Sequence, residues 1–477
     1  MRSVLWYIMH VNLTKNTYKG TTYYAVRICE THYKDGKKTN RLVKTIGNTT
    51  DPHEVENLKR IAWEYILETQ KDIRLSWSEI KRIRPQSPIG LMKTIERIFS
   101  NLELLQSLRN IFVNNYDEFI EEIAYRFYSI TSERMLFLIT GKPKDRYYRL
   151  LDDIFPMKRE LENMFYNALV NKGKITNHEV KIDTTSTYFE GNGISLAMFG
   201  YSRDHRGDKK QVIILLVLID DYPLFSYIFE GNKKDVTLFL DTVKDLKARI
   251  KCERFTIFCD RGFFDPKYLD TLERDRKIFY IMAVPRRKGD WPRLHDSNSK
   301  EFSIEGRRAI LYENSEFRKE LLGELDETLK RIDKDLKILT PSEIKKKYKY
   351  ALKFIDVKNK KLKRKVIEKE KKVLGRWIVL TNIQDKDKSR EEIVDDYKSL
   401  QEIERDFHIL KSELNLRPVG HWGDERAIAH IYICVLTLLI KHIIEKELGK
   451  NKLGEIMEIF SHEIVTEKGV FTWTEAF

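Results

Sequence analysis

The feature that most constrains the fold is an uninterrupted apolar run, QVIILLVLI, at residues 211–219. Every residue of the run after Gln211 is aliphatic, so polar and apolar residues do not alternate as they would in a strand with one face in solvent. A strand of this kind is buried on both faces, which requires cover on both sides of its sheet. The run therefore predicts a layered α/β fold.

The segments around this run supply further strands and helices. Two helices alternate with the later strands, at 235–250, where Asp235 is expected to cap the helix, and at 266–275. Three consecutive strands followed by alternating helices and strands predict a mixed five-stranded sheet. The other four strands are expected at EVKIDTTSTYF (179–189), ISLAMFGYS (194–202), FTIFCD (255–260) and FYIMAVP (279–285).

The rest of the chain falls into regions of different pattern. Aromatic and β-branched runs separated by turn-like pairs predict an antiparallel sheet at the start. The helical patterns that follow suggest a DNA-binding module, with a plain helical packing domain as the alternative. The predicted regions are a small β domain at 1–50, a helical domain at 51–178, the first part of the core at 179–290, a basic insertion domain at 291–373, the last core strand with an acidic helix at 374–415, and a helical region at 416–477.

The acidic helix, expected at residues 391–414, has an apolar stripe with a line of polar residues beside it. At about 100° per residue, positions spaced by seven lie along one line of a helix. The line is formed by Tyr397, Glu404 and Lys411, and the stripe by Leu400, Ile403, Phe407, Leu410 and Leu414. We therefore expect Glu404 at the edge of the buried face, while Glu402 and Lys398 point to solvent.

Two aspartates are placed to form a site with Glu404. Asp183 is expected to end the first strand and Asp260 the fourth, and sites in α/β sheets form at the carboxyl ends of strands. If these strands are neighbours, a divalent cation would relieve the repulsion between the two carboxylates. Oxygen ligands without paired His or Cys favour Mg²⁺ or Mn²⁺, and two such ions would suit attack on a phosphodiester. The alternative is that these aspartates are ordinary helix caps and turn formers.

The net charge favours a polyanionic partner. Lys and Arg number 87 against 73 for Asp and Glu, which gives +14 at neutral pH. Such an excess is typical of proteins that bind nucleic acid. It is concentrated at residues 341–372, where 14 basic side chains accompany 4 acidic ones.

Cysteine usage and hydropathy indicate an intracellular protein without a membrane partner. The four cysteines form no CxxC pair and no zinc-like spacing with histidines, which suits a reducing compartment. Residues 1–15 lack the long apolar core of a signal peptide. The most apolar run, Ala427–Ile440, is short for a membrane span and predicts a buried helix.

Several spaced motifs resemble the DDE transposases of bacterial and archaeal insertion sequences, in the superfamily marked by the YREK signature, Y-x2-R-x3-E-x6-K. Tyr397, Glu404 and Lys411 fit its spacing, whereas Leu400 stands in the Arg position and is interpreted as a packing residue. KIDTTSTYFEG is similar to the first-Asp motif, CDRGF to the second, and GYSRDHRGDKKQ to the loop before the third strand. The resemblance covers about 179–290 and 375–440.

This resemblance implies a ribonuclease H-like core, interrupted by an insertion domain before the Glu404 helix. It implies metal-dependent cleavage at the transposon ends, followed by attack of the freed 3′ hydroxyl on target DNA. Asp183, Asp260 and Glu404 would hold two Mg²⁺ or Mn²⁺ ions, and Tyr397 and Lys411 would contact the DNA backbone. The implied partners are the terminal inverted repeats and target DNA, bound by a homodimer assembled on the ends, in the cytoplasm and associated with the nucleoid.

Other DNA contacts have open alternatives. Arg261 either reaches a phosphate or pairs with a carboxylate, and Lys209 and Lys210 either touch DNA or are solvated. The run KLKRKVIEKEKK (361–372) either binds DNA or is a solvated helix face. Trp422 either stacks on a base or, as we expect, packs against the protein.

Two competing functions remain beside an active transposase. One is a nuclease of the same fold that cuts DNA without joining it. The other is a non-catalytic DNA-binding protein derived from a transposase, although all three acidic positions are filled, which disfavours it.

Overall fold

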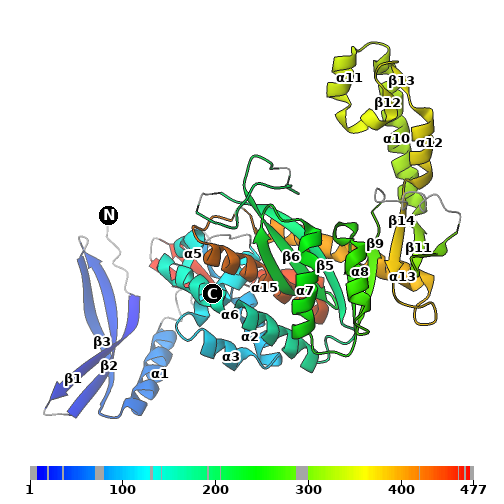
Figure 1. Cartoon of the computed structure of the whole chain (residues 1–477). Helices are drawn as coiled ribbons and strands as arrows, with labels where there is room; N and C mark the ends of the chain where they lie inside the picture. Colours follow the sequence, from blue (N-terminus) through cyan, green and yellow to red (C-terminus); the bar gives the residue numbers. More distant parts are fainter. Residues whose placement is uncertain are drawn as a thin grey trace. The chain divides into compact units, whose positions relative to one another are not determined.

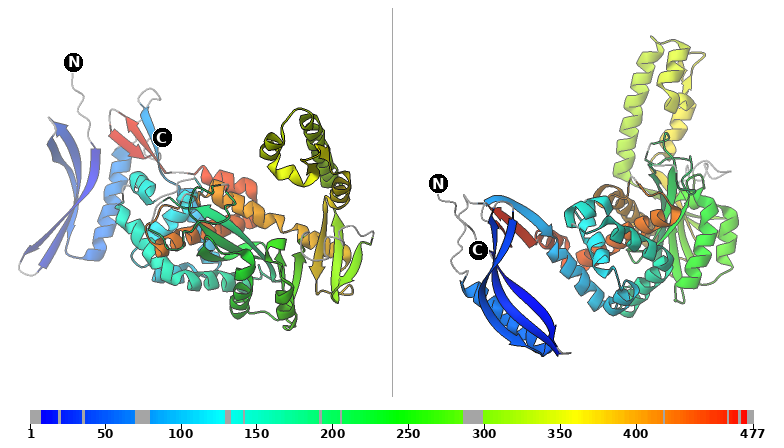
Figure 2. Two further views of the ribbon diagram at one scale, coloured as in Figure 1. Left: turned by 45° about the horizontal axis from the view of Figure 1, so that its top comes forward. Right: turned by 90° about the vertical axis from the view of Figure 1, so that its left-hand side faces the viewer.

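The computed structural model describes residues 8–18, 21–34, 37–69, 80–128, 133–140, 142–190, 193–204, 206–285, 299–417, 419–459, 461–466 and 469–472. The chain divides into two compact units, one of Met1–Lys93 with Gly454–Phe477 and one of Thr94–Leu453. Figures 1 and 2 show their elements. All the candidate site residues belong to the larger unit.

The smaller unit begins with the antiparallel sheet expected for residues 1–50. Its strands are β1 (Ile8–Tyr18), β2 (Thr21–Lys34) and β3 (Lys37–Thr49), in that order. Helix α1 (Pro52–Thr69) packs on this sheet through a small core of Val26, Ile28, Val55 and Ala62.

A second sheet in the smaller unit corrects two expectations. Strand β4 (Ile80–Ser87) pairs with β15 (Ser461–Thr466), which pairs with β16 (Gly469–Thr472). The regions 51–178 and 416–477 were expected to be helical, yet each contributes strand. The pairing of β4 with β15 joins segments that are far apart in the sequence, so no local pattern in either segment reveals it.

Helices occupy the first part of the larger unit, as predicted. Helix α6 is the longest, and its buried face includes Leu150, Leu161 and Phe165. It packs against α15 (Asp424–Leu448), from the later part of the chain, and against α4 and α5. The helices are α2 (Ile89–Asn101), α3 (Leu105–Ile111), α4 (Tyr116–Arg126), α5 (Glu133–Thr140) and α6 (Lys144–Asn171).

One mixed sheet of eight strands forms the centre of the larger unit, in the order β10-β11-β14-β9-β8-β5-β6-β7. Strand β8 is parallel to β5 and to β9, and the other neighbouring pairs are antiparallel. The strands are β5 (Glu179–Tyr188), β6 (Gln211–Ile219), β7 (Tyr222–Glu230), β8 (Phe255–Cys259), β9 (Ile278–Ala283), β10 (Glu301–Ile304), β11 (Arg307–Glu313) and β14 (Arg376–Thr381). All nine residues of β6 are buried, as its unbroken apolar run predicts.

The segment ISLAMFGYS (194–202) is not a strand, contrary to expectation. It crosses the ends of β6 and β7 as a loop, joined to β6 by a single bridge between Met198 and Gln211. The crossing is so close that a Cβ atom on Gly200 would lie 2.0 Å from the Gly231 carbonyl oxygen. Phe199 and Tyr201 are exposed on this loop, so its apolar residues do not indicate a buried strand.

Helices cover the sheet (Figure 1). Helix α7 (Asp235–Arg249) connects β7 to β8, and helix α8 (Pro266–Glu273) connects β8 to β9. Helix α15 (Asp424–Leu448) packs its apolar side chains against those of β6. Among the described helices, α15 alone is long and apolar enough to cross a membrane, but 89% of its most apolar window is buried inside the protein. It is therefore a core helix, as expected.

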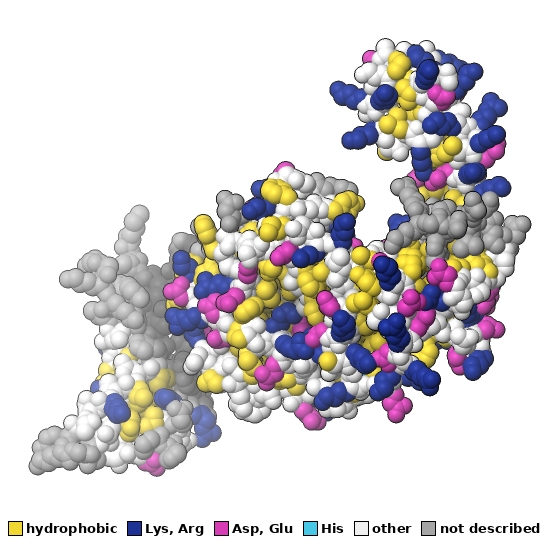
Figure 3. All heavy atoms as spheres, viewed as in Figure 1, with side chains coloured by type: hydrophobic (Ala, Val, Ile, Leu, Met, Phe, Trp, Pro, Cys, Tyr) yellow, Lys and Arg dark blue, Asp and Glu magenta, His cyan; other side chains and the backbone are white. Residues whose placement is uncertain are grey.

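The predicted insertion is partly a continuation of the sheet. Its strands β10 and β11 pair in line with β14, so the sheet is larger than the five strands expected. The remainder contains α10 (Ser315–Leu336), α11 (Pro341–Lys347) and α12 (Arg364–Val373), which enclose a separate core with Ile332, Ile344 and Phe354. Lys and Arg side chains gather on its surface (Figure 3).

The acidic segment is not one continuous helix. Helix α13 (Arg390–Lys398) ends before a short turn, α14 (Gln401–His408) follows, and a π-helical turn (Ile409–Glu413) comes next. The apolar stripe is nevertheless buried as predicted, with Ile403, Phe407, Leu410 and Leu414 in the core and Leu400 partly buried. The turn and the π-helix interrupt the regular α-helical spacing on which the predicted line of Tyr397, Glu404 and Lys411 was based.

Candidate active site

Strand register brings Asp183 and Asp260 together. The parallel pairing of β5 with β8 ends where Ile182 lies opposite Cys259, and the two aspartates are the next residues on each strand. The expected adjacency of these strands is thus confirmed. Asp183 does not end its strand, however, because β5 stays paired with β6 as far as Tyr188.

Glu404 is carried by α14, and two neighbouring acids tie this short helix to the core. Glu402 accepts a hydrogen bond from Nζ of Lys181, a buried side chain of β5, at 2.7 Å. Asp406 is buried and lies 2.8 Å from Nε2 of His442 on α15. Glu402, which was expected to point to solvent, is therefore paired with a buried lysine, although 40% of its side chain remains exposed. Glu404, between these two acids, is the exposed one.

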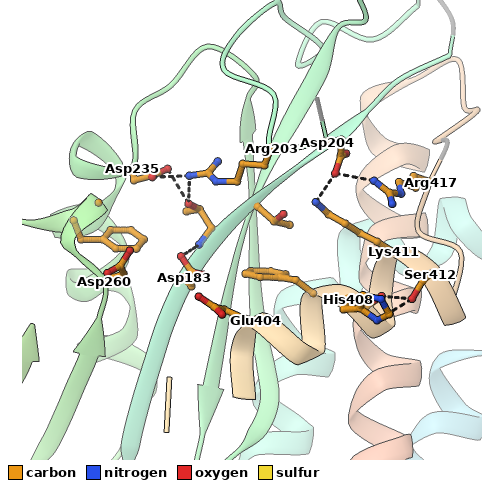
Figure 4. Close-up of a pocket in the computed structure, with 15 residues that line it drawn as sticks. Asp183, Arg203, Asp204, Asp235, Asp260, Glu404, His408, Lys411, Ser412 and Arg417 are labelled. Carbon is orange, nitrogen blue, oxygen red and sulfur yellow. Dashed lines mark hydrogen bonds and ion pairs between the residues drawn. The ribbon is translucent and has the colours of Figure 1, made fainter. Parts of the chain in front are cut away.

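The three acids line one cavity of about 610 Å³ (Figure 4). Asp183 and Asp260 contribute from the sheet, and Glu404 from α14. Because each element is buried on its other side, the carboxylates are presented on rigid supports. Five other charged residues line the same cavity: Arg203, Asp204, Asp235, Lys411 and Arg417.

The acids influence one another electrostatically. Burial raises the pKa of Asp183 to about 7, the backbone N–H of Thr184 opposes this shift, and the nearby Asp260 carboxylate adds to it. Burial and, after it, the charge of Asp260 also raise the pKa of Glu404. Both pKa shifts arise first from burial, and the charge of Asp260 adds to each of them.

Arg203 and Asp235 form another part of the cavity wall. Arg203 donates to Asp235 at 2.6 Å and to Thr184 at 2.8 Å, and the Thr184 hydroxyl donates to Asp235. Asp235 therefore faces the cavity, and its side chain does not cap α7 as expected. The role of Arg203 was missed, although it lies in the motif GYSRDHRGDKKQ.

Asp204 was also absent from the predicted site. Its carboxylate forms an ion pair with Lys411. Its Oδ1 atom lies 2.7 Å from Lys411 Nζ and 2.8 Å from Nη1 of Arg417. Burial lowers the pKa of Lys411, and Asp204 opposes this shift. No sequence pattern predicts a role for Arg417, because it lies in an irregular segment after the π-helical turn.

The remaining predicted site residues do not line the cavity within the part of the chain that the structure describes. Tyr397 donates a long hydrogen bond of 3.4 Å to Oδ1 of Asp260. Arg261 is mostly exposed, with Nε 4.0 Å from Oδ2 of Asp260. Lys209 is half-exposed and 4.0 Å from Glu190, and Lys210 is partly buried.

Trp422 is 85% exposed. The expectation that it packs against the protein is therefore wrong.

The donor set fits a divalent cation by chemistry and by charge. Asp183, Asp260 and Glu404 offer only carboxylate oxygens, which suit Mg²⁺ or Mn²⁺, and a cation would offset their mutual repulsion. Among the described residues, no three His, Cys, Asp or Glu side chains stand close enough together to hold an ion as they are. Binding would therefore require these side chains to turn toward one another.

Comparison with known proteins identifies the family of the chain. No curated protein matches the chain. The profile of the transposase DDE domain matches residues 181–440, which is more than half of the chain and includes both strands and the helix that carry the three acids. Proteins of this family act on DNA and use divalent metal ions. The chain belongs to the transposase DDE domain family.

Proposed function

We propose that this protein cleaves phosphodiester bonds at the ends of an insertion sequence and joins the freed 3′ hydroxyl to target DNA. The observation that carries the proposal is the single cavity lined by Asp183, Asp260 and Glu404. Its basic residues, among them Lys411, suit a polyanionic substrate. The net charge of +14 supports DNA as that substrate.

In this proposal Asp183, Asp260 and Glu404 hold two divalent ions, Mg²⁺ or Mn²⁺. Such ions lower the pKa of a bound hydroxyl or water and stabilise the leaving oxygen. The protein's own contribution is to place the three carboxylates on two strands and one helix. Tyr397 orients Asp260 through its hydroxyl, in addition to any contact with the DNA backbone.

Lys411 contributes a phosphate contact from within the cavity. Arg261, Lys209 and Lys210 are exposed or partly exposed near the strand ends that carry the motifs, and we propose that they contact DNA outside the cavity. Tyr397, Glu404 and Lys411 would thus be the tyrosine, glutamate and lysine of the YREK signature. Leu400, at the arginine position of that signature, packs against hydrophobic side chains instead.

Five adjacent strands, β7-β6-β5-β8-β9, support a ribonuclease H-like core, with two antiparallel pairs followed by two parallel ones. We propose that the domain boundaries follow the sequence pattern, with the basic insertion at 291–373 adding DNA affinity. The active form is a homodimer assembled on the terminal inverted repeats, acting in the cytoplasm at the nucleoid.

The test uses labelled duplexes taken from the ends of the DNA element that contains the gene, with a supercoiled plasmid as target. With Mg²⁺ the protein should nick these ends and join them to the plasmid, and Asp183→Asn should do neither. Asp241→Asn, an exposed change on α7, is the matched control and should behave as wild type. Cleavage without joining would favour the nuclease alternative, and binding without either reaction would favour the non-catalytic one.

A further inference from the structure

The cavity contains a buried carboxylate, Asp204, that forms ion pairs with two basic side chains. The side chain of Asp204 is only 3% exposed. Its Oδ1 atom contacts both Lys411 Nζ and Arg417 Nη1, at 2.7 and 2.8 Å (Figure 4). Its Oδ2 atom has no hydrogen-bond partner among the described residues, although it is buried. Burying a charge in this way is costly, so its role should be specific.

The charges in this cluster do not balance. One carboxylate, Asp204, faces two cations, whereas the neighbouring Arg203 is matched by Asp235. The unit formed by Asp204, Lys411 and Arg417 therefore carries one excess positive charge of its own, in a cavity whose other acids, apart from Asp235, are the proposed metal ligands Asp183, Asp260 and Glu404. An anion that met both cations would complete it.

Both cations keep donors for such an anion. An ammonium group has three N–H donors and a guanidinium has five, so the contacts with Asp204 leave most of them available. The side chains of Lys411 and Arg417 are 12% and 33% exposed and line the cavity, whereas Asp204 is too buried to be reached. Asp204 can therefore stay in place while a ligand binds.

We propose that Arg417 joins Lys411, whose phosphate contact is part of the proposed function, in one subsite for a phosphate of the DNA backbone, and that Asp204 is the positioning residue that orients both. The subsite lies in the same cavity as Asp183, Asp260 and Glu404, so a phosphate held there sets the path of the strand past the acids. This inference rests on the proposed function, because it takes DNA as the ligand.

The direction in which one substitution changes DNA affinity distinguishes an orienting role of Asp204 from a purely electrostatic one. Asp204→Asn removes a negative charge, which by long-range attraction alone would strengthen binding of DNA. If Asp204 orients the two cations, the same change weakens binding, because Lys411 and Arg417 repel each other once the carboxylate is neutral. Asp208→Asn is the matched control: it removes an equal charge from the same loop, where Asp208 is exposed and paired with Arg206.

The experiment measures binding of the full-length protein to a short fluorescent DNA duplex of arbitrary sequence, by polarisation, in EDTA and over a range of NaCl concentrations. We expect Asp204→Asn to weaken binding about 3- to 10-fold, as expected for the loss of an oriented charged contact, while Asp208→Asn binds as tightly as wild type or tighter. Arg417→Met should weaken binding similarly and lower the salt slope by about one.

Coupling between these residues in DNA binding, beyond any coupling in thermal stability, separates positioning from a merely structural role. In the Arg417→Met background, Asp204→Asn should therefore weaken binding less than it does alone. Thermal melting of each variant shows whether it is folded, and Arg417→Met tests the subsite if Asp204→Asn does not fold.

The outcomes distinguish this inference from the proposed function. Asp204→Asn that binds as tightly as wild type, or an Arg417→Met variant with an unchanged slope, overturns the subsite and leaves cleavage by the three acids standing. Wild-type protein that binds in EDTA but never cuts with Mg²⁺ overturns the proposed function and leaves the subsite standing. No binding by the wild type overturns both.

Discussion

Asp183 and Asp260 occupy equivalent positions on two adjacent parallel strands, one residue beyond the last paired residues, Ile182 and Cys259. Their proximity is fixed by backbone hydrogen bonds and does not depend on loops. Glu404 reaches the same cavity from a helix much later in the chain. Two acids are therefore set by the sheet, and the third depends on how α14 is held.

Asp183→Asn should stabilise the metal-free protein, most strongly at alkaline pH. The folded pKa of Asp183 is about 7, raised by burial from 3.8, so the folded state disfavours the ionised form. Stability is therefore lost as the pH rises through this range, and the full penalty is present above pH 7. Thermal melting in EDTA should show a gain for the variant that is about 2 kcal/mol larger at pH 8.5 than at pH 5.5.

Two controls accompany this measurement. Asp241→Asn, at an exposed position of α7, should leave the pH dependence of melting unchanged. Mg²⁺ at pH 8.5 should stabilise wild type more than Asp183→Asn, because it offsets the charge that the variant lacks. Equal pH profiles for wild type and Asp183→Asn would contradict the assigned burial of this carboxylate.

Glu404→Ala should abolish cleavage and strand transfer while binding of the DNA end survives. The substitution removes an acid that faces the cavity, and Glu404 has no ion-pair partner among the described residues that its loss would disturb. Gel-shift binding and cleavage of a labelled end, across a series of Mg²⁺ concentrations, measure the two effects. Gln401→Ala, exposed on the same helix, is the control and should retain both activities.

Cleavage by Glu404→Ala would mean that another residue is the third acid. Glu402 and Asp406 are the other acids of α14, but Lys181 and His442 already hold them. Their substitution should instead lower activity indirectly, by loosening the helix that carries Glu404.

The sequence predicted those parts of the site that follow from local pattern. The strand-like runs were enough to place Asp183 on one strand and Asp260 at the end of another, but their proximity depended on the two strands being neighbours, which only the pairing of β5 with β8 shows. The apolar stripe through Ile403 and Phe407 was enough to bury one face of α14. These features depend on the periodicity of one element at a time, which is visible in the sequence.

Other parts of the site depend on contacts between distant segments. The pairing of Asp204 with Lys411 joins residues 207 positions apart, and nothing local to either residue signals it. The π-helical turn at Ile409–Glu413, which contains Lys411, replaces the regular α-helix that the sequence pattern predicted there. Glu402 was placed in solvent because its partner, Lys181, lies on β5, a strand that the helical pattern cannot reveal.

Replacing Lys361, Lys365 and Lys369 with Gln should flatten the salt dependence of DNA binding. All three are exposed on the insertion, whereas Lys371 pairs with Asp326. Each lost phosphate contact lowers the slope of log K against log salt by about 0.9, so the triple variant should lose up to about 3. Arg at the same positions keeps the charge and should keep the slope. A slope unchanged by Gln would mean that the run is a solvated surface.

Tyr397→Phe should slow cleavage about 10-fold, as is typical when a residue that supports a metal ligand is lost, without weakening DNA binding in EDTA. The reason is that its hydroxyl donates to Asp260. Tyr227→Phe is a matched control, since that hydroxyl donates to Asp245 at 2.7 Å and Asp245 does not line the cavity. Weaker binding by Tyr397→Phe would assign Tyr397 to the DNA backbone instead.

Leu400→Arg should destabilise the fold more than it strengthens binding of the transposon end. The substitution restores the residue that the YREK signature has at this position. Leu400, however, is partly buried and packs against two hydrophobic clusters, one with Ile403 and one with Ile393. A guanidinium placed there loses those contacts and is partly desolvated, which should cost about 1–3 kcal/mol. Thermal melting measures the loss, and gel-shift assays measure end binding.

The neighbouring residue provides the control for this last prediction. Gln401→Arg adds the same charge one position later, at an exposed site, and should change stability by less than about 0.5 kcal/mol. If Leu400→Arg melts like Gln401→Arg and binds the end more tightly, the side chain has reached solvent and DNA. Leu400 would then be an ordinary variant of the signature position, and the junction between α13 and α14 would be open to the DNA strand.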